Sequence, residues 1–332
     1  MQQPKYSVII PVFNRPDEVD ELLASLTVQT YSNFEIINVE DGSAIPCDCI
    51  VDKYKEKLSV KYFTKENTGP GTSRNFGAER ASGEYFIFFD SDCIIPPNYF
   101  SEVERELTTL SVEAFGGPDK AHESFTPIQK AISYSMTSFF TTGGIRGGKE
   151  RLDKFYPRSF NMGISRRVFK ATKGFSTLRF GEDIDFSLRI IKSGFTTQLF
   201  PKAFVYHKRR TDFKKFYRQV YNSGIARINL NIIHPGTLKL VHVLPSAFFL
   251  GMLFCVLIAP LCSYSLVIPL AYSLLILINS LIITLNFKVA LLSVPAAWVQ
   301  LCGYGLGFIG SFWQRVILKK GHYAAFEKNF YR

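Results

Sequence analysis

The stretch EYFIFFDSDCIIPP, from Glu84 to Pro97, decides the fold because it joins an apolar run directly to two carboxylates. Tyr85 to Phe89 has no polar alternation and is too short for a helix, which predicts a buried strand. Asp90 and Asp92 follow at once, separated by one residue. Because buried charges need partners, this strand end is the first candidate for a functional site.

The preceding residues repeat an alternation of strand and helix. YSVIIPVFN is an apolar run that leads into a turn, and Pro16 followed by Asp17 marks a helix start. This order is typical of an α/β fold, Rossmann-like, with a mostly parallel sheet and helices on both faces. The predicted strands are Tyr6–Asn14, Phe34–Val39, Leu58–Phe63 and Tyr85–Phe89, and the predicted helices include Pro16–Gln29 and Thr72–Arg80.

Polar side chains follow three of these strands. They are Asn14, the run from Glu40 to Ser43, and the run from Asp90 to Asp92. Ligands of open α/β sheets bind beyond the carboxyl ends of the strands, so we expect these three ends to converge on one crevice. A single Asp after a strand is more often a helix cap, but three such ends together favour a site.

Carboxylates at this position predict a divalent cation. Mg²⁺ and Mn²⁺ prefer oxygen ligands, and magnesium sites combine one or two carboxylates with substrate phosphates. A cation at Asp90 and Asp92 would offset their repulsion and bridge a diphosphate leaving group. No CxxC pair occurs among the six cysteines, so the sequence suggests neither a zinc site nor a disulfide framework.

A second acidic cluster, in FGEDIDFSLRI, contains Glu182, Asp183 and Asp185. Acidic residues in a first helical turn stabilise the helix dipole, which is one interpretation. The other is that the turn at Phe180–Gly181 presents Asp183 to a cavity, where it acts as a general base. The spacing leaves both open.

The C-terminal part has a different composition. Between Lys239 and Arg315 the only Asp, Glu, Lys or Arg is Lys288, and breaks near residues 259–265 and 286–288 leave three apolar stretches of roughly 20 residues, enough to cross a bilayer. We expect a multi-pass protein of the inner (plasma) membrane with its N-terminal domain in the cytoplasm, because the N-terminal apolar run is short and contains Pro11, unlike a signal peptide. The net charge of +11 fits that side, since cytoplasmic flanks collect Lys and Arg. The predicted parts are a catalytic domain (1–206), an interfacial segment (207–238), about three transmembrane helices (239–313) and a basic tail (314–332).

The segment from Val205 to His234 mixes seven Lys and Arg residues with Phe and Tyr. Such a segment beside apolar spans is typical of a helix on an anionic membrane surface. Nucleic acid is a weaker interpretation because the apolar block starts within a few residues. The charges either bind a lipid-phosphate acceptor or only anchor the protein.

Five segments in register resemble glycosyltransferase family 2: SVIIPVFNR, VEDGS, NTGPGTSRNFGAERASGEYFIFFDSD, NMGISRRVF and FGEDIDFSLRI. They extend from Ser7 to about Tyr206. The resemblance implies the GT-A fold and an inverting transferase that uses a nucleotide-diphospho-sugar with Mg²⁺ or Mn²⁺. It would move a hexosyl or N-acetylhexosaminyl group in cell-envelope or exopolysaccharide synthesis.

The resemblance also implies roles for individual residues. Asp90 would face the ribose and sugar, Asp92 would bind the metal, and Asp183 would deprotonate the acceptor hydroxyl. Glu182 would position the acceptor, and His207 matches a further metal or diphosphate contact. The residues expected to bind the nucleotide-sugar are Pro11, Val12, Asn14, Asp41, Gly69, Arg74, Asp90 and Ser91.

The sequence departs from the processive members of that family. They carry Gln-x-x-Arg-Trp, whereas RQVYNSG has Gln219 followed by Asn222 and Ser223. We therefore expect one sugar to be added per encounter, onto a lipid-linked saccharide or a polyprenyl phosphate. Two alternatives stay open: a phosphatase of the haloacid dehalogenase type with Asp90 as nucleophile, and a membrane sensor that binds a nucleotide-sugar without turnover.

Overall fold

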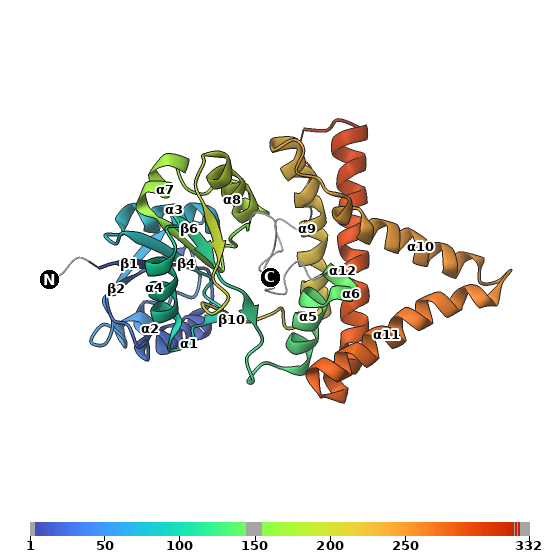
Figure 1. Cartoon of the computed structure of the whole chain (residues 1–332), viewed down its shortest axis with the longest axis horizontal. Coiled ribbons are helices and arrows are strands. Elements are labelled where there is room, and N and C mark those ends of the chain that lie inside the picture. Colours follow the sequence, from blue (N-terminus) through green and yellow to red (C-terminus); the bar gives the residue numbers. More distant parts are fainter. Residues whose placement is uncertain (1–3, 144–154, 322, 324, 326–332) are drawn as a thin grey trace. The chain divides into compact units, whose positions relative to one another are not determined.

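The structure is a computed structural model that describes residues 4–143, 155–321, 323 and 325. It divides into two compact units (Figure 1). Unit 1 comprises Met1–His122 and Gly148–Lys208, and unit 2 comprises Glu123–Gly147 and Arg209–Arg332. Each unit is described by itself.

Unit 1 is built on a seven-stranded sheet with the order β3-β2-β1-β4-β8-β6-β9. The pairs among β3, β2, β1 and β4 are parallel, whereas β8 is antiparallel to both β4 and β6. The strands are β1 (Tyr6–Val12), β2 (Phe34–Asp41), β3 (Val60–Lys65), β4 (Tyr85–Phe89), β6 (Ala114–Gly116), β8 (Asn161–Ser165) and β9 (Thr197–Leu199). The helices are α1 (Pro16–Thr27), α2 (Asp48–Asp52), α3 (Pro70–Arg80), α4 (Tyr99–Thr109), α7 (Arg166–Thr172) and α8 (Glu182–Lys192).

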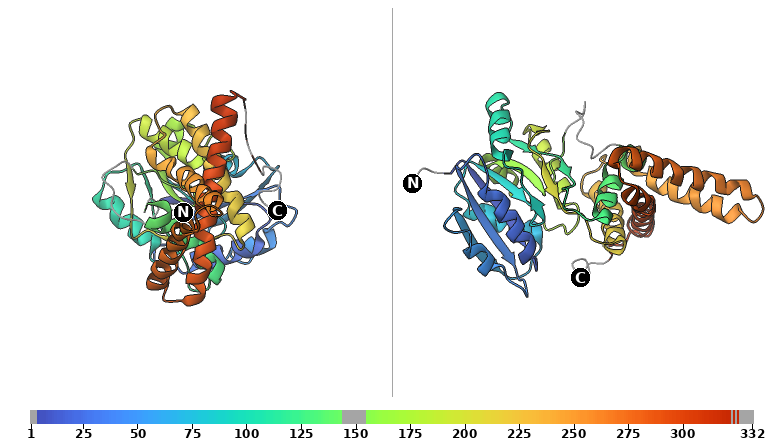
Figure 2. Two further views of the ribbon diagram at one scale, coloured as in Figure 1. Left: turned by 90° about the vertical axis from the view of Figure 1, so that its right-hand side faces the viewer. Right: turned by 90° about the horizontal axis from the view of Figure 1, so that it is seen from below.

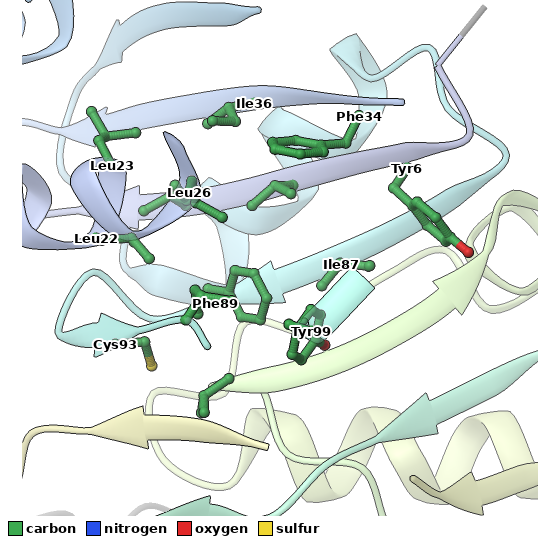
Figure 3. Packing of buried hydrophobic residues seen from close by; sticks show 14 of the residues in the cluster. Tyr6, Leu22, Leu23, Leu26, Phe34, Ile36, Ile87, Phe89, Cys93 and Tyr99 are labelled. Carbon is green, nitrogen blue, oxygen red and sulfur yellow. The ribbon is translucent and has the colours of Figure 1, made fainter. Parts of the chain in front are cut away.

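Both faces of the sheet are buried because successive side chains of a strand point to opposite sides. Along β4, Ile87 and Phe89 belong to one apolar cluster, with side chains from α1 and α4, and Phe86 and Phe88 belong to the other, with side chains from α3, α7 and α8. Figure 3 shows the first cluster, in which Leu22, Leu23 and Leu26 lie over the strands. This confirms the predicted α/β fold with helices on both faces.

Unit 1 also contains a small three-stranded sheet. It pairs β10 (Val205–His207) with β5 (Cys93–Ile94), antiparallel, and with β7 (Asp119–Lys120), parallel. His207 is opposite Cys93 in this register. The pairing therefore brings a residue from the end of unit 1 next to Asp92.

Unit 2 is helical. Among the described residues, two helices are long and apolar enough to cross a membrane, Ser263–Thr284 and Phe287–Ile317, and a third apolar helix, Leu244–Ile258, has 15 residues. The elements are α5 (Pro127–Thr137), α6 (Phe139–Thr142), α9 (Phe213–Ile233), η1 (Leu240–His242), α10 (Leu244–Ile258), η2 (Ser263–Leu266), α11 (Val267–Thr284), α12 (Phe287–Phe312) and a π-helical turn η3 (Trp313–Ile317). Figure 2 shows α10 and α11 as a hairpin.

The units differ from the predicted division of the chain. The predicted boundary at residue 206 is close to the end of unit 1 at Lys208, but α5 and α6 belong to unit 2. The reason is packing: Ala131, Ile132 and Met136 of α5 share an apolar cluster with residues of α9 and α12. The predicted interfacial segment contains α9, and residues 322, 324 and 326–332 of the predicted basic tail are outside the described residues.

Candidate active site

The candidate site lies at the carboxyl end of β4, where Asp90, Ser91 and Asp92 leave the sheet. Arg74, from α3, is buried and donates from Nη2 to Asp90 Oδ1 at 2.6 Å. Its Nη1 is 3.3 Å from Glu182 Oε1. One guanidinium therefore links the two acidic clusters that the sequence singled out separately.

The second cluster begins α8. Gly181 precedes it with φ of +81°, a left-handed conformation that suits glycine. Arg158 donates from Nε to Asp183 Oδ2 at 2.5 Å, and the Ile184 amide donates to Asp183 Oδ1 at 2.8 Å. The Asp183 carboxylate is thus held in one orientation at the helix start.

The two neighbouring carboxyls differ in pKa. Burial and the charge of Asp183 raise the pKa of Glu182 to about 7. Burial would also raise the pKa of Asp183, but the charge and hydrogen bond of Arg158 outweigh it and lower that pKa. Burial opposes the charge of Arg74, yet the carboxylates of Asp90 and Glu182 raise its pKa overall. Asp183 is therefore the ionised member of the pair, and Glu182 is able to carry a proton near neutral pH.

Asp92 and His207 form a second group of possible ligands. Asp92 Oδ1 is 3.1 Å from His207 Nε2, and Arg15 Nη1 donates to Asp92 Oδ2 at 2.6 Å. Neighbouring ligands on an octahedral ion with bonds of about 2.1 Å lie about 3.0 Å apart, so the pair fits Mg²⁺ or Mn²⁺. Cys93 is close, and burial raises the pKa of its thiol well above the usual range. Mg²⁺ and Mn²⁺ prefer oxygen and imidazole donors to sulfur, which favours Asp92 and His207 as the ligands.

The ring of His207 is fixed by its surroundings. It stacks on Phe160 with ring centroids 4.9 Å apart, and its Nδ1 is 3.8 Å from Asp119 Oδ2. At 3.8 Å this contact is longer than a hydrogen bond. Asp119 therefore places a carboxylate near the imidazole without a direct hydrogen bond to Nδ1.

Asp41 is largely enclosed by the loop that precedes α3. Its carboxylate accepts from the amides of Thr68 at 3.0 Å and Gly69 at 2.9 Å, and it is paired with Lys65. Gly69 has φ of +95°, which this turn requires. Asp41 shapes the loop in this structure, and its predicted contact with a nucleobase stays a prediction.

The turn after β1 is hydrogen-bonded to the turn after β2. Asn14 has φ of +54°, and its Oδ1 accepts from the amides of Ala44 at 2.7 Å and Ile45 at 3.0 Å. The Val12 side chain lies in the apolar core, whereas Pro11 is half-buried. Any nucleoside contact at Val12 would therefore use its backbone atoms.

The structure joins most of the predicted site residues in unit 1 and adds others. Near the carboxyl end of β4 the structure brings together residues of the strand end, α3, α8 and β10: Asp90, Ser91, Asp92, Arg74, Glu182, Asp183 and His207. The ends of β1 and β2 and the turns that follow β1 and β3 contain the others, which are Pro11, Val12, Asn14, Asp41 and Gly69. The sequence did not indicate the cationic partners of the carboxylates, which are Arg15, Lys65 and Arg158, or the carboxylate near His207, which is Asp119. Arg15 ends the block SVIIPVFNR and could have been noticed, but nothing near Arg158 in the sequence marks it.

Comparison with known families decides the assignment. The model of glycosyl transferase family 2 matches residues 7–172, which is half of the chain. The chain belongs to glycosyltransferase family 2. The family match covers Arg74 and the Asp90–Asp92 motif and ends before Glu182 and Asp183. Family membership removes the support for the phosphatase interpretation.

Similar proteins are also described as glycosyltransferases. The chain is 33% identical over 147 residues to an uncharacterized glycosyltransferase of Rickettsia felis, which covers 44% of this chain and 23% of that protein. An uncharacterized glycosyltransferase of Haemophilus influenzae is 30% identical over 194 residues, 56% of this chain and 62% of that protein. In both cases the chain spans less than two thirds of the relative.

Among solved structures, the chain is similar to the mannosyltransferase PcManGT from Pyrobaculum calidifontis in complex with GDP-Man and Mn²⁺. The TM-score is 0.61 at 15% identity, over 95% of this chain and 89% of that chain. A likeness at this identity shows the fold, which is the GT-A fold predicted from the sequence.

Proposed function

We propose that the protein is an inverting glycosyltransferase that moves a sugar from a nucleotide-diphospho-sugar to a membrane-associated acceptor. The observation that carries the proposal is the Arg74 bridge between Asp90 and Glu182. It places the strand-end carboxylates, expected to bind a donor, next to a carboxylate pair able to handle a proton. Unit 1 would then contain residues for donor binding and residues for activation of the acceptor.

The donor would lie across the turns that follow β1, β2 and β4. Asp92 and His207 would hold a divalent cation, Mg²⁺ or Mn²⁺, which when bound supplies positive charge to the diphosphate leaving group. Arg15 fixes the Asp92 carboxylate through its 2.6 Å contact and adds a second positive charge beside it. Asp90, oriented by Arg74, would accept hydrogen bonds from the ribose and the sugar.

The acceptor would be activated by Asp183. Its lowered pKa keeps the carboxylate ionised, so it can accept the proton of an acceptor hydroxyl as that oxygen attacks the anomeric carbon. Attack from the face opposite the diphosphate inverts the configuration. Arg158 is a positioning residue that acts through Asp183, and Glu182 would position the acceptor.

Unit 2 supports the proposed acceptor class. The apolar helices and the basic helix α9 support a place at the inner membrane, with the catalytic unit in the cytoplasm. A lipid-linked saccharide or a polyprenyl phosphate fits that place. On α9, Asn222 and Ser223 stand where processive members have Arg and Trp, which supports the addition of one sugar.

The test is sugar transfer to extracted membrane lipid by wild type and Asp183→Asn, with a panel of labelled donors. We expect transfer by wild type and a loss of about 10²- to 10⁴-fold in kcat for the variant. A nearly unchanged kcat would point to a phosphate acceptor, which needs no base. Donor binding without transfer to any lipid would favour the sensor interpretation.

A further inference from the structure

The helices α10, α11 and α12 enclose a triangle (Figure 1). Ser246, near the start of α10, donates from Oγ to the Gly305 carbonyl at 3.3 Å, whereas α11 ends beside the start of α12 at Phe287. These two points on α12 are about 27 Å apart, because 18 residues separate them at 1.5 Å each. Arms of 15 and 18 residues, about 22 and 27 Å long, meet at the η2 tip. α12 is therefore the base of the triangle and runs across the hairpin direction.

The hairpin is predominantly apolar and carries no formal charge. No Asp, Glu, Lys or Arg occurs between Lys239, which precedes α10, and Lys288, which follows α11. Only 11% of the apolar window that contains α11 is buried, against 44% of the window on α12. Exposed apolar side chains occupy consecutive positions such as Leu281–Ile283, and at the tip Leu261 is 89% exposed. Because exposure is not confined to one stripe, hydrocarbon that surrounds the hairpin fits better than a protein that covers one face.

The other long helix, α12, has a charged neighbour. A Cβ on Gly303 would meet Val220 at 2.6 Å, one on Gly307 would meet the Tyr221 carbonyl at 2.0 Å, and Ser311 Oγ donates to the Ile225 carbonyl at 3.4 Å. The contacts advance together along both chains, so α9 and the C-terminal half of α12 lie side by side and parallel.

The charges of α9 bear on where α12 can lie. Lys214 and Lys215 are exposed, and Arg218 and Arg227 are half-buried on the same helix. Each Lys or Arg at the centre of a bilayer costs about 2.5–3.5 kcal/mol or more. If α12 crossed the bilayer, its neighbour α9 would have to enter with these four charges.

We propose that the α10–α11 hairpin enters the bilayer and returns, whereas α12 lies beside α9 along the membrane surface. This inference rests on the membrane placement in the proposed function and does not depend on the sugar chemistry. The triangle is about 20 Å high, which takes the tip past the middle of a hydrocarbon core about 30 Å thick. Arg315, Lys319 and Lys320, which follow α12, then lie on the same side as the catalytic unit. The three-span expectation puts them on opposite sides.

The test uses cysteines as reporters in the full-length protein. Cys49 in unit 1 and Cys262 at the hairpin tip are both exposed, and Lys320→Cys adds a reporter after α12. Sealed vesicles are selected in which Cys49 reacts almost completely with a membrane-impermeant maleimide. Labelling of each cysteine is then read by peptide mass spectrometry, before and after detergent.

We expect the cysteine at position 320 to react together with Cys49, and Cys262 to be at least tenfold less labelled until detergent is added. Protection of position 320 in the same vesicles would mean that α12 crosses, and would overturn the proposal. Reaction of Cys262 without detergent would show that the hairpin is outside the bilayer, with the same consequence. Vesicle flotation distinguishes the two ways in which the proposal can fail. A protein that does not float with the vesicles would contradict the membrane placement as well. A protein that floats but has position 320 protected would contradict only the proposed topology.

Discussion

The Arg74 guanidinium is the contact on which the site depends most. It is buried between Asp90 and Glu182 and lies 5.3 Å from the centre of the Phe175 ring. Planar guanidinium groups suit paired carboxylates better than an ammonium does. Arg74 therefore orients both carboxylates.

Arg74→Met should therefore destabilise the protein as well as inactivate it. Removal of one member of a buried ion pair costs about 3–5 kcal/mol, because the remaining charges stay buried. Denaturant unfolding in detergent measures the change. Arg80→Met, at the more exposed end of the same helix, is the matched control and should cost less than about 1 kcal/mol. Equal effects of the two substitutions would contradict the bridge.

The raised pKa of Glu182 predicts a pH-dependent stability. The folded pKa is about 7 and the ordinary value is 4.5, so the folded protein binds the extra proton. This contribution is complete below about pH 4.5 and is lost as the pH rises through about 7. Glu182→Gln should gain stability relative to wild type between pH 5 and pH 8. Unfolding midpoints across this range test it, with Glu79→Gln, an exposed carboxyl on α3, as control. Parallel curves for wild type and Glu182→Gln would rule out the raised pKa.

Arg158 should set the acid limb of the rate profile. Its charge and hydrogen bond outweigh burial and lower the pKa of Asp183, so Arg158→Gln should raise that pKa. The acid limb of kcat/KM then moves to higher pH, and Arg158→Lys should restore part of the shift. The measurement is the pH dependence of transfer by the three proteins. A variant with lower rates but an unmoved acid limb would mean that Arg158 acts elsewhere.

Among the strands, the sequence predicted best those with a continuous apolar run. The strands β1, β2 and β4 agree with prediction to within two residues because both faces of each are buried. The strands β5, β7 and β10 have two or three residues each and carry no periodic signal, so they were not predicted. His207 could therefore be suggested by resemblance, but its contact with Asp92 needed the structure.

The packing of α9 on α12 predicts an asymmetry between glycines. A Cβ on Gly307 would meet the Tyr221 carbonyl at 2.0 Å, whereas one on Gly251 in α10 meets nothing within 4 Å. Gly307→Ala should force the helices apart and destabilise unit 2 by about 1–3 kcal/mol. Gly251→Ala should be neutral or stabilising by up to about 1 kcal/mol, since Ala is the better helix former. Thermal unfolding in detergent compares them, and an equal response would contradict the close approach.

At the scale of the whole molecule, composition predicted an apolar C-terminal region but not its arrangement. Charge counts cannot show that α5 packs against these helices, because that depends on contacts of Ala131 and Ile132. In the sequence, 75 residues lie between the end of α5 and the start of α9. In the same way, the sequence predicts about three apolar spans but carries no information on the packing of α12 against α9. Candidate site residues that directly follow a strand can thus be identified from the sequence, whereas contacts between distant segments cannot.

The proposed function requires that Asp92 and His207 hold a divalent cation on which donor binding depends. The most direct measurement is calorimetric binding of a panel of nucleotide-diphospho-sugars to the full-length protein in detergent, with Mn²⁺ or with EDTA. Wild type should bind one donor in Mn²⁺ and lose at least tenfold in affinity in EDTA, whereas Asp92→Ala should bind weakly in both. Asp52→Ala, an exposed carboxylate on α2, should behave as wild type. Donor binding by folded wild type that is unchanged by EDTA and by Asp92→Ala would contradict the account.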